Sequence, residues 1–333
     1  MNILGIETSC DETAAAVVEN GCRTRSSVVA SQVDVHQEYG GVVPELAARK
    51  HIENICAVVD QAVAEAGIGM GNMDGIAVTR GPGLVGALLV GFSFAKALSY
   101  ATGIPWVGVD HLQGHLNSVF LAEDPPSFPF VALLVSGGHT AVYHVISYTD
   151  ARCLGHTRDD AAGEAFDKVA KMLALGYPGG VAISRMARQG DPEKISFPRA
   201  WIDKNRFAFS FSGLKTAVKR YIDTHADYRS HMADIAAGFE AAVVDVLCHK
   251  LLHAAAETGC ADIAIVGGVA ANRRLREAVS KAAGVQGLNL HVPDISLCGD
   301  NAAMIAAAGY HHLADPEGLR GRLDDDVYSR ARI

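Results

Sequence analysis

The amino-acid sequence predicts an α/β protein made of two similar halves that face each other across a cleft. The chain has 333 residues, 49% of them hydrophobic and 20% charged, which is enough to bury a large core and form two domains. One order of strands, turns and helices occurs twice along it, and a proline-rich joint at 124–127 separates the two copies. We therefore expect an N-terminal domain at 1–127 and a C-terminal domain at 128–333.

The N-terminal half is expected to open with an antiparallel pair of strands, because apolar runs at 2–7 and 14–18 flank a polar turn at 8–13. A third strand near 27–31 follows the Asn20-Gly21 turn. Apolar periodicity and glycine or proline punctuation indicate the remaining elements. These are a helix at 44–66, a strand at 75–79, a small-residue helix at 85–101 and a strand at 105–109.

The C-terminal half repeats this order. Strands at 130–135 and 141–146 flank a polar turn at 136–140, which parallels the start of the chain. The elements that follow are a helix at 232–258, a strand at 262–266, a helix at 273–283, a strand at 288–292 and a helix at 302–313. A helical segment at about 155–230 is inserted in this half. We expect the final helices to pack back on the first domain.

Composition restricts the class and the location of the protein. The formal net charge of -8 argues against a broad nucleic-acid-binding surface, although a local basic stripe or a partner subunit can supply one. The seven cysteines are scattered without C-x-x-C spacing, which indicates reduced thiols. No apolar run approaches the length that crosses a bilayer, and the start lacks the segments of an export signal. We therefore predict a cytoplasmic protein without membrane contact.

A histidine pair follows the predicted strand at 105–109. Asp110 is a natural helix cap, so His111 and His115 lie one turn apart on the same helix face, where two imidazoles can bind one metal ion. His249 and His253 have the same spacing, but they lie inside a long helical run with no turn or carboxylate nearby. We interpret that second pair as structural.

Asp300 precedes the helix at 302–313, at the junction that corresponds to His111 in the other half. If the two halves face each other, His111, His115 and Asp300 meet from opposite walls and form a two-histidine, one-carboxylate site. Such a site suits Fe(II) or Zn(II) and leaves coordination positions open. The alternative is that Asp300 only caps its helix and that the histidines are ordinary polar residues.

Three turns at strand ends, at 8–13, 136–140 and 267–272, carry glycine or polar residues whose backbone N–H groups can approach a phosphate. Each alone is a common turn, and none is a P-loop. Together they resemble the actin, Hsp70 and sugar-kinase (ASKHA) superfamily, which implies that the first two hold phosphates and the last holds adenosine.

The inserted segment offers two further candidates. Asp167 can accept bonds from a ribose or substrate hydroxyl, and Gly180 lets the backbone meet a sugar, unless this stretch is only a capped, solvated helix start. The basic residues Lys204, Arg206, Lys215, Lys219 and Arg220 flank an aromatic segment at 207–214. This stripe can bind RNA by charge and stacking, or the phenylalanines are core and the lysines ordinary surface.

Seven motifs resemble, in order, those of the bacterial TsaD family over nearly the whole chain. They are Gly5-Ile-Glu-Thr-Ser-Cys-Asp-Glu-Thr13, Asp110-His-Leu-Gln-Gly-His115, Leu134-Val-Ser-Gly-Gly-His-Thr140, Asp160-Ala-Ala-Gly-Glu-Ala-Phe-Asp167, Tyr177-Pro-Gly-Gly180, Phe209-Ser-Phe-Ser-Gly-Leu-Lys215 and Gly267-Gly-Val-Ala-Ala-Asn272. The resemblance implies transfer of a threonylcarbamoyl group from threonylcarbamoyl-AMP to N(6) of the adenosine next to the anticodon, in tRNAs that read codons starting with A. It also implies the partners TsaB and TsaE, with TsaC making the donor.

The resemblance also implies the site residues. The metal ligands are then His111, His115 and Asp300, with Fe(II) favoured and Zn(II) possible. The donor is held by Leu134, Val135, Ser136, Gly137, Gly138, Asp167, Gly180 and Asn272. The chain departs from some relatives at Ser184, where they have an acidic residue, and at Asp110, where we expect Asn.

The implied chemistry is acyl transfer from a mixed anhydride, in which orientation and charge stabilisation do most of the work. Asp11 and Glu12 are candidates for a general base because their turn is expected to face the cleft, although a structural role is an equal alternative. A metalloprotease is disfavoured because Leu112, not glutamate, follows the first histidine. A small-molecule kinase and a non-catalytic scaffold of a tRNA-modifying assembly remain as alternatives.

Overall fold

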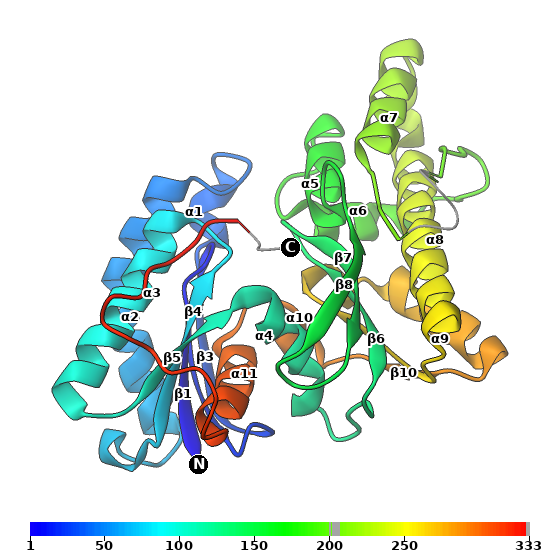
Figure 1. Ribbon diagram of the computed structural model, residues 1–333. Coiled ribbons are helices and arrows are strands. Elements are labelled where there is room, and N and C mark those ends of the chain that lie inside the picture. Colours follow the sequence, from blue (N-terminus) through cyan, green and yellow to red (C-terminus); the bar gives the residue numbers. More distant parts are fainter. Residues whose placement is uncertain (200, 202–206, 331–333) are drawn as a thin grey trace. The chain divides into compact units, whose positions relative to one another are not determined.

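The structure is a computed structural model that describes residues 1–199, 201 and 207–330. The chain forms two compact units (Figure 1). Unit 1 contains Met1–Pro125, Ser147–Asp150 and the C-terminal part from Gly299 onward, and unit 2 contains Pro126–Ile146 and Ala151–Cys298. Unit 1 is therefore assembled from both ends of the sequence.

Unit 1 is built on a five-stranded sheet in the order β3-β2-β1-β4-β5. The strands β1, β2 and β3 pair antiparallel, and β1, β4 and β5 pair parallel. Their bounds are β1 Asn2–Glu7, β2 Glu12–Glu19, β3 Arg23–Ser31, β4 Gly75–Gly81 and β5 Trp106–Asp110. The antiparallel start and the parallel continuation agree with the order expected from the sequence.

Helices cover both faces of this sheet. On one face α2 (Pro44–Glu65) and α3 (Val85–Thr102) bury Leu4, Ile6, Ile76 and Val78. Gly5 and Ala77 point the other way, because side chains alternate along a strand. They meet α11 (Ala302–Ala314), whose Gly309 leaves no room for a Cβ beside Ala77. The last long helix thus packs on the sheet of unit 1.

The remaining short elements of unit 1 are α1 (Val33–Gln37), the 3-10 turns η1 (Met70–Asn72) and η2 (Ser118–Leu121), and α4 (His111–Asn117). The apolar helix α3 is long and apolar enough to cross a membrane by length and composition alone. The expectation that no such run exists was wrong, because Lys96 is the one charged residue in an otherwise largely apolar helix. In this structure α3 packs on α2 and β4, and its Lys96 Nζ donates to the Leu323 carbonyl at 3.0 Å.

Unit 2 repeats the topology of unit 1, with a five-stranded sheet in the order β8-β7-β6-β9-β10. The strands β6, β7 and β8 pair antiparallel, and β6, β9 and β10 pair parallel. Their bounds are β6 Phe130–Val135, β7 Thr140–Val145, β8 Ala151–His156, β9 Asp262–Val266 and β10 Asn289–His291. The duplication expected from the sequence is therefore present strand by strand, although β8 was not predicted.

The helices of unit 2 surround α8 (Met232–Thr258), which contacts α6, α9 and strand β6. The others are α5 Ala162–Met172, α6 Gly179–Ala187, α7 Ser212–Thr224, α9 Arg273–Gln286 and α10 Ile295–Cys298, with 3-10 turns η3 Tyr228–His231 and η4 Gly268–Ala271. In α8, His253 Nε2 lies 3.2 Å from Glu257, and His249 packs on Trp201. These contacts agree with a structural role for that histidine pair.

Candidate metal centre and nucleotide pocket

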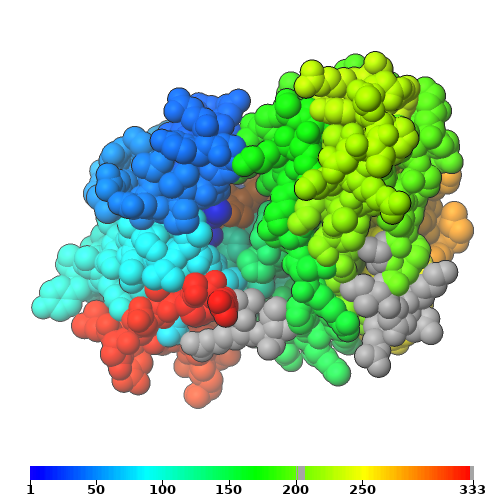
Figure 2. Space-filling view, turned by 90° about the horizontal axis from the view of Figure 1, so that it is seen from above, coloured from blue at the N-terminus to red at the C-terminus, as the bar shows by residue number. Residues whose placement is uncertain are grey.

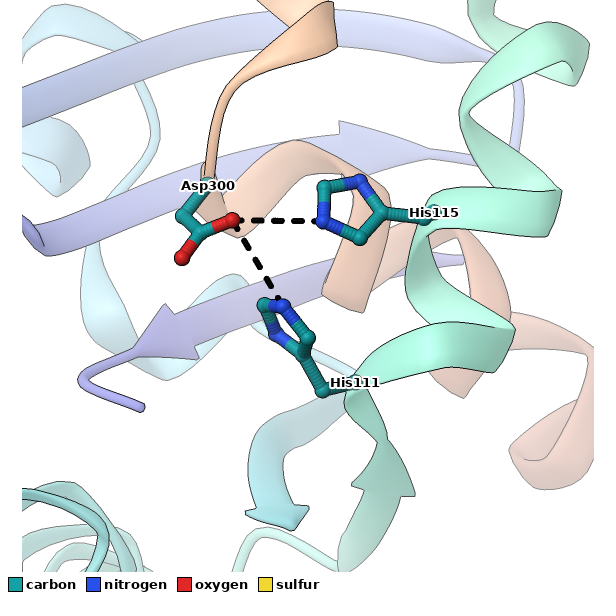
Figure 3. A group of neighbouring side chains, drawn as sticks. All are labelled: His111, His115 and Asp300. Carbon is teal, nitrogen blue, oxygen red and sulfur yellow. Dashed lines mark hydrogen bonds and ion pairs between the residues drawn. The ribbon is translucent and has the colours of Figure 1, made fainter. Parts of the chain in front are cut away.

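His111, His115 and Asp300 form a group in unit 1 (Figure 3). Asp300 reaches toward both imidazoles from the loop that precedes α11, and both histidines come from α4. The three residues were predicted to meet, and they do. The prediction that they lie on opposite walls of two domains was wrong, because the chain returns to unit 1 at Gly299.

Local sequence explains this placement. Asp110 caps α4, since its Oδ1 accepts from the backbone N–H groups of Leu112 and Gln113 at 2.8 and 3.1 Å. Asn301, not Asp300, caps α11, because its Oδ1 accepts from Met304 N at 2.9 Å. The alternative in which Asp300 is only a helix cap is therefore wrong, and its carboxylate is available to the histidines.

Close packing of α4 on α11 brings the ligands together. A Cβ on Gly114 would lie 2.7 Å from Cδ1 of Ile305, so a larger residue there would displace that side chain. The capping residue of α4, Asp110, is also held in position, because Tyr328 Oη donates a hydrogen bond to its Oδ2 at 2.5 Å. The C-terminal segment that carries Tyr328, red in Figure 2, runs over the cyan surface of α3. The metal centre thus rests on elements from both ends of the chain.

The donor atoms are spaced as the ligands of one ion. Two atoms that each bind an ion at about 2.1 Å with tetrahedral angles lie roughly 3.4 Å apart. Asp300 Oδ1 lies 3.2 Å from His115 Nε2 and 3.5 Å from His111 Nε2, and all three atoms lie within 4.8 Å of one another. Two imidazoles and one carboxylate suit Fe(II) or Zn(II) and leave other positions open. The residues therefore fit a divalent cation.

Glu7 supports His111 from behind. This carboxylate is fully buried at the end of β1, and its Oε2 lies 3.1 Å from His111 Nδ1 and accepts from Thr79 Oγ1 at 2.6 Å. Burial opposes protonation of His111, but the charges of Asp300 and Glu7 outweigh it and raise its pKa to about 9. Glu7 favours a proton on Nδ1, and an ion bound at Nε2 would replace the second proton of the imidazolium.

Replacing Glu7 with glutamine is expected to weaken metal binding about 10- to 100-fold, the usual cost of losing a carboxylate behind a metal-bound histidine. The measurement is competition for Zn(II) with a coloured chelator. Thr79→Val removes a donor to Glu7 without touching His111, so its effect is expected to be smaller. Equal affinity in Glu7→Gln and the unmodified protein would show that Glu7 does not orient the ligand.

The candidate bases Asp11 and Glu12 lie at the turn between β1 and β2. His51 holds this turn, because its Nε2 lies 3.0 Å from the Cys10 carbonyl and its Nδ1 lies 2.8 Å from Thr13 Oγ1. Glu12 Oε1 accepts from Ser31 Oγ at 2.9 Å, whereas its buried Oε2 has no partner among the described residues. Burial raises the pKa of Glu12 to about 7 against the effect of the Ser31 bond, and the charges of Asp11 and Asp300 add to the rise.

Unit 2 contains a cavity of about 520 Å³. Gly137 from the β6–β7 turn, Gly163 at the start of α5, and the 178–188 and 268–273 stretches surround it. A Cβ on Gly163 would lie 2.6 Å from the Ser136 carbonyl, so glycine is required for α5 to approach the turn this closely. The volume lies in the range of small-ligand sites, about 300–1,000 Å³.

Four of the eight predicted donor-binding residues line this cavity: Gly137, Asp167, Gly180 and Asn272. Asp167 Oδ1 accepts from Gly179 N at 2.7 Å, so this carboxylate orders the turn that opens α6. Leu134 and Val135 are buried inside β6, while Ser136 is buried and Gly138 is exposed, all four outside the lining. The sequence located the cavity, and the strand residues support its floor from behind.

Sequence reasoning missed a polar cluster at one end of the cavity. Asn272 Nδ2 donates to Ser184 Oγ at 2.9 Å and to Glu240 Oε1 at 2.8 Å, and Ser184 Oγ also donates to Glu240 Oε1 at 2.6 Å. Glu240 is only 6% exposed. The only signal in the sequence was a glutamate within an otherwise apolar helical run. A carboxylate from α8 therefore lies beside Ser184 and Asn272 at this end of the cavity.

The aromatic segment at 207–214 belongs to the core of unit 2. Phe209 and Phe211 are fully buried, and Lys215 Nζ lies 2.6 Å from Asp160 Oδ2. Asp159 accepts from Phe211 N at 2.8 Å and from Ser212 Oγ at 2.8 Å, which fixes the start of α7. The predictions for Lys204 and Arg206 lie outside the described residues. These contacts support the alternative in which the phenylalanines of this segment are core residues and do not stack on RNA.

Comparison with known proteins gives a consistent result. The family model TsaD, described as tRNA N6-adenosine threonylcarbamoyltransferase, matches residues 23–307. A protein of that name from Desulforapulum autotrophicum is 59% identical over 334 residues, which is 100% of both chains. Another from Syntrophobacter fumaroxidans is 56% identical and covers 93% of this chain and 94% of its own.

Solved structures support the fold. HypF from T. kodakarensis matches with a TM-score of 0.65 at 16% identity, over 94% of this chain and 47% of its own. Component A of (R)-2-hydroxyglutaryl-CoA dehydratase from Acidaminococcus fermentans matches with a TM-score of 0.57 at 15% identity, over 95% of this chain and 100% of its own. These likenesses confirm the duplicated actin-like fold. Together with the sequence matches, they establish that the chain belongs to the TsaD family, the tRNA N6-adenosine threonylcarbamoyltransferases.

Proposed function

We propose that this protein transfers the threonylcarbamoyl group from threonylcarbamoyl-AMP to N(6) of the adenosine 3′ to the anticodon, in tRNAs that read codons beginning with A. A C–N bond forms at the carbamoyl carbon, the bond from that carbon to the phosphate oxygen breaks, AMP leaves, and N(6) loses one proton. The His111, His115 and Asp300 group carries this proposal, because a cation site suits activation of a carbonyl next to a phosphate leaving group.

The residues of the chain divide the work. A cation held by the two histidines and Asp300, with Fe(II) favoured and Zn(II) possible, supplies Lewis acidity or a clamp for the donor. The β6–β7 turn has open space beside the Cα atoms of Gly137 and Gly138, where we expect their backbone N–H groups to bind a phosphate. Asp167, Gly180 and Asn272 hold the nucleoside, so that orientation supplies much of the rate.

Glu12 is our candidate for the base that accepts the N(6) proton. A carboxylate with a pKa near 7 is a competent base at neutral pH, and Asp11 beside it keeps that pKa high. A cation at Asp300 cancels only one of the contributing charges. Because burial is the largest cause, the pKa stays above its ordinary value.

The expected result is a rate that rises with pH, with its midpoint no higher than about pH 7, because the deprotonated carboxylate is the active form. Glu12→Gln is expected to lower the rate about 10²- to 10⁴-fold and to remove this dependence. The measurement is single-turnover transfer at saturating donor from pH 5 to 8. Asp11→Asn is expected to lower the midpoint without removing the dependence, because it removes a charge that raises the pKa of Glu12, and an unchanged profile in Glu12→Gln would assign the proton to another group.

We place the reaction in the cytoplasm and expect TsaB and TsaE as partners, with TsaC supplying the donor. Exposed apolar side chains on α2 and α3 support a protein contact, since Ile52, Val85 and Leu89 are 65%, 46% and 42% exposed. Co-purification of TsaB with the intact protein, and its loss in Leu89→Asp, would support this surface.

The test of function is mass spectrometry of tRNA nucleosides after incubation of the protein and its partners with threonine, bicarbonate and ATP. Threonylcarbamoyladenosine is the expected product, and its absence would refute the proposal. The same mixture without tRNA, supplied with casein or sugars, tests the protease and kinase alternatives. The absence of a glutamate between His111 and His115 disfavours the protease.

A further inference from the structure

Unit 2 has a second cavity of about 320 Å³ beside the nucleotide pocket, which we call the arginine groove. The floor is Glu240 of α8, and the walls are α6 and the first turns of α9. The lining residues are Ser184, Ala187, Arg188, Glu240, Arg273, Arg274 and Glu277. Ser184, Arg188 and Arg273 also line the larger cavity, so the two spaces adjoin.

Three arginines line the walls of the groove, and one of them forms an ion pair with a carboxylate of the groove itself. Arg273 Nε pairs with Glu277 Oε1 at 2.7 Å. Neither Arg188 nor Arg274 forms an ion pair with a carboxylate in the described part of the chain. Arginine in the first turn of a helix is also unfavourable to the helix dipole. Stability of α9 therefore does not explain why Arg274 stands there in a chain of net charge -8.

The floor of the groove offers a hydrogen-bond acceptor. Glu240 Oε1 is occupied by Ser184 Oγ and Asn272 Nδ2, whereas Oε2 accepts no hydrogen bond from the described residues. Since Glu240 lines the groove and is otherwise buried, a ligand there meets a carboxylate oxygen at the bottom. Such an oxygen binds a hydroxyl or amine and repels a phosphate.

Guanidinium groups on the walls and an acceptor on the floor complement a nucleotide, with its phosphate outward and a ribose hydroxyl or base amine inward. The volume, about 320 Å³, is at the lower end of the range for small ligands and suits one nucleotide. Single-stranded RNA loops are recognised in this manner, by splayed nucleotides that meet arginine planes and hydrogen-bonding side chains.

We propose that the arginine groove binds one nucleotide of the tRNA substrate, with its phosphate on Arg188 and Arg274 and its sugar or base on Glu240. This inference rests on the proposed function and assigns a tRNA contact to unit 2. A free mononucleotide has the same chemistry, and the experiment separates it from RNA.

The test uses the complete modification mixture with Arg274→Ala, because Arg274 lines the groove but not the nucleotide pocket. The KM for tRNA is expected to rise roughly tenfold, and the slope of log affinity against log salt to fall by about 1 for this single phosphate contact. AMP affinity, measured by calorimetry, is expected to stay unchanged. Arg274→Lys keeps the charge and is expected to keep the salt slope, which separates a phosphate contact from damage to the fold.

The matched control is the double variant Lys219→Ala with Arg220→Ala. These exposed cations on α7 belong to the basic stripe that the sequence analysis considered as an RNA-binding surface. If the wild type modifies tRNA while Arg274→Ala keeps its KM and salt slope, the inference fails and the proposed function stands. A loss of AMP affinity in Arg274→Ala would assign the groove to free nucleotide and overturn the inference. A rise in KM confined to the α7 variant would place the RNA there instead.

Discussion

Alanine in place of His115 is expected to abolish both metal binding and tRNA modification. His115 is fully buried, and its Nε2 lies 3.2 Å from Asp300 Oδ1, so its loss leaves an ion with two protein ligands instead of three. Because losing an outer partner alone costs about 10- to 100-fold, we expect a larger effect here, more than about a hundredfold in affinity. The measurements are the metal content of the purified protein and the yield of modified nucleoside.

His253→Ala is the control for this prediction. The His249 and His253 pair has the same spacing on α8, and its rings contact Trp201, Phe207 and Glu257. We expect this variant to keep its metal and its activity. Retention of metal and activity by His115→Ala, with circular dichroism showing an intact fold, would remove the metal centre from the mechanism.

Alanine in place of Asn272 is expected to weaken both the nucleotide pocket and the fold. Asn272 Oδ1 caps α9 through Leu275 N at 2.9 Å, a bond worth about 1 kcal/mol. The amide also donates to the buried Glu240, and loss of a donor to a buried charge costs about 1–3 kcal/mol. We therefore expect about 2–4 kcal/mol less stability, measured by urea unfolding, and at least tenfold weaker AMP binding.

Asn272→Ser separates the two roles. Serine is a good helix cap but is too short to reach both Ser184 and Glu240, so stability is expected to recover in part while AMP binding stays weak. Wild-type AMP affinity in both variants would show that the cluster of Ser184, Glu240 and Asn272 is purely structural.

The sequence predicted most of the fold because its elements carry strong local signals. Asp110 and the histidines at i and i+4 predicted α4. The long apolar run predicted α8 with the bounds that the structure shows. Strand β8 was missed because Ala151–His156 alternates poorly and is only partly buried. Strand β8 forms because this segment pairs with β7, and no local sequence pattern reveals that pairing.

Site residues that lie together in one segment could be predicted from the sequence. Contacts between residues from distant segments could not. The two histidines of the candidate metal centre were identified from a motif, but the contact of Glu7 with His111 depends on strand β1 ending beside α4, across 104 positions of sequence. Glu240 was hidden for the same reason, since its partners Ser184 and Asn272 lie 56 and 32 positions away. The return of the final helix to the first domain was expected, but Asp300 was assigned to the opposite wall because the return begins at Gly299, just before it.

The split construction of unit 1 has a consequence for biosynthesis. His111 and His115 leave the ribosome long before Asp300 and α11, which cover the sheet from its other side. Until the last 35 residues emerge, that face of the sheet lacks its helix and the two histidines lack Asp300. We therefore expect a chain truncated before Gly299 to carry both histidines of the candidate metal centre without its carboxylate, and to bind Zn(II) more weakly than the full chain.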